Sequence, residues 1–101
     1  MIDCVEQAGG STWRITVPMT QAQARGLMLA GQKQLLAPST SLPITIELGA
    51  VEQADSSGLA VLLDWMRSAR QQGRPMHIDG MPPALQALAD LYGVAPLLQV
   101  A

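Results

Sequence analysis

Short segments with a strand pattern alternate along the chain with longer segments that have a helix pattern. Apolar and polar residues alternate over Trp13–Val17 and again over Pro43–Leu48, which is typical of strands that bury one face. Met76–Asp79 is predicted to be a third short strand. Ile2–Glu6 is expected to pair with the first of these strands as a hairpin, because Gly9–Ser11 is a turn signal.

Three helices are predicted between and after these strands. The first begins near Thr20, which forms a capping-box pattern with Gln23, and it ends before a loop at Pro38–Ser41. The second begins near Ser56 or Ser57 and stops before Gly73. The third is opened by the prolines at 82 and 83 and ends at Gly93.

The resulting order is strand, strand, helix, strand, helix, strand, helix. Strands that alternate with helices indicate crossover connections, so we expect an α/β fold with a mixed sheet of four or five strands and helices mainly on one face. The helical spacing predicts which apolar residues cover the sheet. These residues are Leu27, Leu59, Leu62, Leu63, Met66, Leu85 and Leu88.

The helix after Gly58 carries a second set of apolar positions. With Leu59, Leu62 and their neighbours on the core side, Val61 and Trp65 fall on the opposite side at 100° per residue. We therefore expect Val61 and Trp65 to be exposed and to form part of a partner-binding surface, since tryptophan is enriched at binding hot spots. The alternative is a helix that is apolar over a wide arc and lies under a loop.

Length and composition restrict the possible functions. The 101 residues form a single domain over positions 1–101, and 49% of them are hydrophobic while 14% are charged. A net charge of −2 argues against a nucleic-acid-binding surface. No apolar run approaches the roughly 20 residues of a membrane span, so direct membrane insertion is not expected. The low charged fraction suggests that a partner covers part of the surface.

The residue inventory offers little for cofactor binding or catalysis. The chain has one cysteine, Cys4, and one histidine, His77, so it cannot build a structural zinc site alone, and no cofactor is expected. Asp3, Cys4 and Glu6 occupy the region where an export signal would be basic and then apolar, which favours a cytoplasmic location. No glycine-rich phosphate loop and no nucleophile–histidine–acid set is visible, so an enzyme is not expected.

The stretch from Asp55 to Leu59 is the candidate site. Asp55, Ser56 and Ser57 place a carboxylate and two hydroxyls at the start of a helix, where unpaired amides and partial positive charge favour an anion such as a phosphate. The simpler interpretation is that one of these three residues is only the helix N-cap.

These residues resemble a known family. The Asp-Ser-Ser-Gly-Leu sequence resembles the phosphorylatable motif of STAS domains that act as anti-sigma-factor antagonists, whose modified residue matches Ser56. The segments Ala69–Gly73, Ile78–Gly80 and Leu88–Val94 resemble the MlaB-like STAS subunits of Mla phospholipid ABC transporters. The antagonists usually carry a Gly-Glu-Leu-Asp-type element where this chain has Val17–Thr20, which favours the transporter subunit.

The resemblance implies a STAS fold and a non-enzymatic accessory subunit. Such a subunit binds an MlaF-like ATPase at the inner membrane and regulates or stabilises it in a system that maintains outer-membrane lipid asymmetry. The alternative is an anti-sigma factor antagonist that a kinase phosphorylates on Ser56. Six residues are predicted to contact the partner. They are Asp55, Ser56, Ser57, Gly58, Val61 and Trp65.

Overall fold

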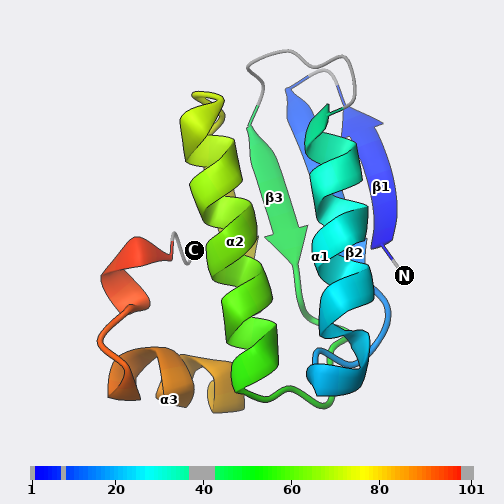
Figure 1. Ribbon diagram of the computed structural model, residues 1–101. Coiled ribbons are helices and arrows are strands. Elements are labelled where there is room, and N and C mark those ends of the chain that lie inside the picture. Colours follow the sequence, from blue (N-terminus) through cyan, green and yellow to red (C-terminus); the bar gives the residue numbers. More distant parts are fainter. Residues whose placement is uncertain (1, 8, 37–42, 99–101) are drawn as a thin grey trace.

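The computed structural model describes residues 2–7, 9–36 and 43–98, and Figure 1 shows how its elements are arranged. The elements follow one another in the predicted order. They are β1 (Ile2–Gln7), β2 (Gly10–Ile15), α1 (Gln21–Leu36), β3 (Ile44–Glu47), α2 (Ser56–Gln71), β4 (Met76–Asp79), α3 (Pro83–Leu91) and a short 3-10 helix, η1 (Ala95–Leu97). The predicted loop at Pro38–Ser41 lies outside the described residues.

The four described strands form one mixed sheet in the order β1-β2-β3-β4. β1 and β2 are antiparallel, whereas β2, β3 and β4 run parallel, as the crossover helices require. β2 begins earlier than predicted. Gly10 and Ser11 belong to the strand and not to the turn, because both pair with β1 and the Ser11 N–H donates to the Pro43 carbonyl at 2.9 Å.

One face of the sheet is covered by the helices, and no described helix lies on the other, which we call the uncovered face (Figure 1). The alternating residues that point under the helices are buried, including Trp13, Ile15, Ile46 and Ile78. A charged row crosses the uncovered face in register, one residue from each strand. The row consists of Asp3, Arg14, Glu47 and Asp79, and Arg14 Nε lies 3.3 Å from Glu47 Oε1.

The first turn of α1 contains half of the predicted capping box, because the Gln23 N–H donates to the Thr20 backbone carbonyl at 3.0 Å and not to the Thr20 hydroxyl. The Thr20 N–H donates to Gln23 Oε1 at 3.3 Å, and the Thr20 hydroxyl donates to the same oxygen. Gln23 therefore satisfies groups at the helix start that have no partner within the helix.

Trp65 lies in the core, so the prediction that it is exposed is wrong. Its side chain is 0% exposed and lies against α1 at Gly31, where a β-carbon would overlap the indole. Its ring meets Trp13 edge to face with centroids 5.5 Å apart, and its Nε1 donates to the Met28 carbonyl at 3.4 Å. Val61, one turn earlier, is also fully buried, contrary to prediction.

The error comes from the width of the buried face of α2. This helix packs on the sheet, on α1 and on α3 at once, so its apolar arc is wider than a single stripe. The predicted core residues Leu59, Leu62 and Met66 are indeed buried. Leu63 lies at the outer margin of the arc and is only partly buried.

Candidate functional site

Two helices begin at the same end of the domain, where β3 leads into α2 (Figure 1). Asp55 is the N-cap of α2, with one carboxylate oxygen accepting a hydrogen bond from the Ser57 N–H at 2.8 Å. Its other oxygen accepts from the N–H of Gln21, the first residue of α1, at 3.1 Å. The N-cap interpretation is thus confirmed for Asp55, and this one side chain caps both helices.

These contacts determine the charge state of Asp55. Partial burial of the carboxyl tends to raise its pKa, but hydrogen bonds from the backbone amides of Gln21, Ser57 and Gly58 and from the Ser57 hydroxyl outweigh it. The pKa of Asp55 therefore lies below its ordinary value, and the group is anionic at neutral pH.

The loop before α1 and the loop before α2 are joined at this end. Met19 and Ala54 form an isolated parallel bridge, in which the Met19 N–H donates to the Gln53 carbonyl at 2.8 Å and the Asp55 N–H donates to the Met19 carbonyl at 3.2 Å. Gly58 is buried under this bridge, and a β-carbon on it would overlap the Met19 carbonyl oxygen. Gly58 is therefore required for close backbone packing, and its contact with a partner stays a prediction.

The two serines differ in their surroundings. Ser57 is half-buried and uses both its N–H and its hydroxyl on Asp55. Ser56 is exposed, and its hydroxyl makes no hydrogen bond with any described residue. A group attached to Ser56 would lie beside the first turn of α2 and close to the start of α1, where the two helix dipoles favour negative charge.

The predicted partner-binding set is divided by the structure. Asp55, Ser56 and Ser57 lie at the accessible end of α2, whereas Gly58, Val61 and Trp65 are buried. The outer face of α2 carries a different set at helical spacing. Its members are Ser56, Ala60, Leu63, Arg67 and Arg70.

A hollow of about 620 Å³ lies along this outer face, and sequence reasoning missed it. It is lined by α2 residues from Ala60 to Gln71, with Met28 contributed by α1 and Leu97 by η1. No local signal in the sequence indicates it, because Met28 and Leu97 reach it only through tertiary packing.

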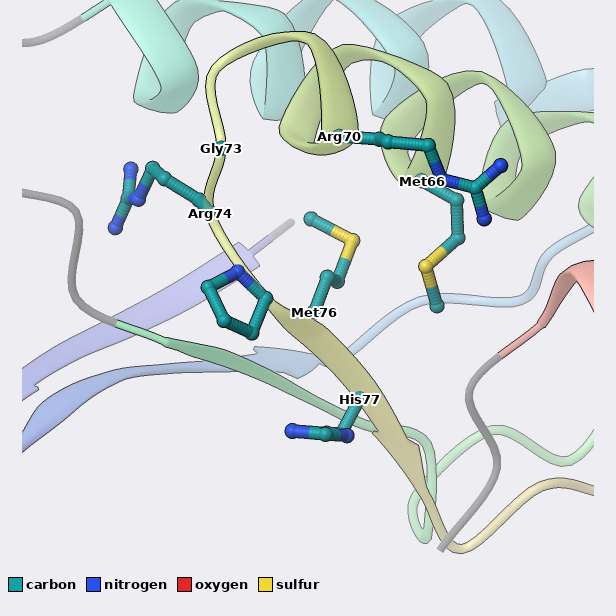
Figure 2. A pocket seen from close by; sticks show the side chains of 7 residues that line it. Met66, Arg70, Gly73, Arg74, Met76 and His77 are labelled. Atoms are coloured by element: carbon teal, nitrogen blue, oxygen red, sulfur yellow. The ribbon is translucent and has the colours of Figure 1, made fainter.

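A second hollow of about 340 Å³ lies where α2 ends and β4 begins. Figure 2 shows Met66 and Met76 at its centre, with Arg70 and Arg74 on opposite sides of them. The two guanidinium groups point away from each other, so they do not converge on one anion (Figure 2).

Over the described ranges, no group of three or more His, Cys, Asp or Glu side chains is placed to hold a metal ion. None of the helices within those same ranges is both long and apolar enough to cross a bilayer. What the site does present is an exposed hydroxyl on a firmly capped helix end, which suits recognition by a partner or modification.

Comparison with known structures identifies the fold. An anti-sigma-factor antagonist (STAS) domain protein from Planctomyces limnophilus superposes with a TM-score of 0.80 at 11% identity, over 98% of this chain and 87% of that one. The phosphorylated form of the Bacillus cell fate determinant SpoIIAA gives a TM-score of 0.73 at 13% identity, over 100% and 91% of the two chains. A sulfate transporter family protein from Wolinella succinogenes gives 0.73 at 18% identity, over 95% and 79%.

At these identities the structural matches establish the fold alone. Among curated proteins none matches this sequence. The sequence does match the model of a family described as "Mlab, STAS domain" over residues 5–99. Because that match spans nearly the whole chain and the fold agrees with it, the chain belongs to the MlaB-type STAS domain family.

Proposed function

We propose that this domain is a non-enzymatic accessory subunit that binds and regulates the ATPase of an Mla-type phospholipid ABC transporter. In this role it would lie in the cytoplasm, where its partner would hold it at the inner membrane. It would contribute to outer-membrane lipid asymmetry. The match to the MlaB-type family model supports this assignment. The absence of a visible catalytic set in the sequence is consistent with an accessory role.

The exposed hydroxyl of Ser56 is the observation that carries the proposal. Because Asp55 already caps the helix, Ser56 is not needed for capping. Its side chain is exposed at a rigid helix end, in continuity with the outer face of α2. A partner that docks here would contact a small neutral hydroxyl.

The second candidate function is an anti-sigma factor antagonist that is switched by phosphorylation of Ser56. The same exposed hydroxyl supports it, and so does the fold shared with antagonists such as the phosphorylated SpoIIAA structure. Two helix starts beside Ser56 would accommodate the phosphate without disturbing the fold.

Titration of Ser56 variants against the purified ATPase subunit tests the proposal. Ser56→Glu should weaken binding by about 2 kcal/mol or more, because the interface would have to desolvate a new charge beside the Asp55 carboxylate. Ser56→Thr should bind like the wild type, since it keeps the hydroxyl. His77→Glu adds the same charge on the uncovered face of the sheet and should have no effect.

A wild-type domain that fails to bind the ATPase would overturn the transporter proposal. Incubation with an anti-sigma kinase and ATP then tests the alternative. Mass spectrometry that finds one added phosphate on the wild type and none on Ser56→Ala would support it.

A further inference from the structure

We propose that the hollow along α2 receives an amphipathic helix of the partner, with an acidic residue placed against Arg70. This inference rests on the proposed function and specifies how the ATPase subunit contacts the domain. The hollow extends from Ala60 to Gln71, about 16 Å at the rise of an α-helix.

The shape of the hollow fits a helix. Its walls are themselves helical, with α1 on one side of α2 and η1 on the other (Figure 1). Recognition of this kind places apolar side chains of the partner, spaced by three or four residues, into a groove between helices. The hollow is also continuous with Ser56, because Ser56, Ala60, Leu63, Arg67 and Arg70 follow one face of α2 at such spacings.

The floor of the hollow is apolar and partly accessible. Met28 and Leu63 are half-buried, Ala60 is exposed, and Leu97 is 47% exposed although it is a large hydrophobic residue. Met66, which is buried, also lines the hollow. Methionine side chains adapt to the shape of an incoming apolar residue, and apolar side chains that adjoin one another at the surface favour a protein partner.

The charged side chains of the hollow indicate which charge the partner helix should carry. Asp64 is already neutralised, because one oxygen accepts from Arg67 Nη2 at 3.0 Å and the other accepts from Gln32 Nε2 at 2.7 Å. Arg70 is exposed and makes no ion pair with any described residue. The hollow therefore has one uncompensated positive charge beside an apolar floor, which complements a helix with an apolar stripe and a flanking Asp or Glu.

The test is a titration of the purified ATPase subunit with two pairs of matched variants. Arg70→Glu should weaken binding about tenfold or more, whereas Lys33→Glu, which makes the same charge change at an exposed position outside the hollow, should not. Leu97→Ser should also weaken binding about tenfold, while Leu36→Ser, at an 82% exposed leucine outside the hollow, should not.

Circular dichroism melting establishes that each variant is folded. The helical Asp and Glu residues of the ATPase are then replaced by Arg one at a time. One of these replacements should restore the binding of Arg70→Glu, because it reverses the charge on the residue that faces position 70. If the wild type binds but all four variants bind equally well, the groove inference is overturned and the proposed function stands. If the wild type itself does not bind, both are overturned.

Discussion

Ser56 and Trp65 lie on the same helix, α2, but their surroundings differ: Ser56 is exposed at the helix start, whereas Trp65 is buried in the core. Trp65 is fully buried and contacts Trp13, Gly31 and the Met28 carbonyl, so its position serves the fold. The Ser56 hydroxyl, by contrast, bonds to no described residue, and Asp55 supplies the helix cap by accepting from the Ser57 N–H. The comparison shows that tryptophan, the residue type most often found at binding hot spots, is used here for packing, so residue type alone does not locate a binding surface.

Replacement of Trp65 should have the largest effect. Trp65→Ala should lower the free energy of unfolding by about 3–5 kcal/mol, because it removes a large buried side chain and leaves a cavity against α1. Urea unfolding followed by circular dichroism measures this loss. A change below about 1 kcal/mol would mean that Trp65 is a surface residue after all.

A β-carbon at Gly58 should have an intermediate effect. Gly58→Ala should destabilise the domain by about 1–3 kcal/mol, because the added methyl group meets the Met19 backbone, which is fixed by the bridge to Ala54. Gly49→Ala is the matched control, since a β-carbon there has no neighbour within 4 Å. Equal stability of the two variants in thermal melts would show that the bridge moves aside easily.

The charge on Asp55 should have the smallest effect, and that effect should depend on pH. Its pKa in the folded domain is below the ordinary value of 3.8, so its stabilising contribution is complete above that value and is lost as the pH falls through the folded-state pKa. Asp55→Asn should lower the melting temperature at about pH 7, and this deficit should shrink at about pH 2.5. Asp79→Asn controls for the loss of one exposed carboxylate.

If Asp55→Asn lowers the melting temperature by the same amount at both pH values, the stabilising contribution of Asp55 comes from the positions of its acceptor oxygens and not from its charge. The double cap would then depend only on having an acceptor at each of the two positions.

Much of the fold could be predicted from the pattern of the sequence alone. Met76–Asp79 and the start of α2 at Ser56 agree with the prediction, because strand alternation and helix caps are local properties. The order of elements also follows from local pattern, and with it the mixed sheet and the helical layer.

The parts that could not be predicted depend on tertiary packing. A helical projection misplaces Trp65, because it shows the spacing of apolar residues but not how many elements pack around the helix. The hydrogen bond from Gln21 to Asp55 joins residues 34 positions apart, which no local motif indicates. The α2 hollow likewise depends on where Leu97 packs after α3.

The uncovered face of the sheet has a consequence for self-association. The row formed by Asp3, Arg14, Glu47 and Asp79 carries three carboxylates for one guanidinium. Two copies stacked face to face would bring these excess negative charges together at short range, and the resulting repulsion opposes stacking and the aggregation that follows from it. Copies of the domain at high local concentration are therefore kept from adhering through their sheets.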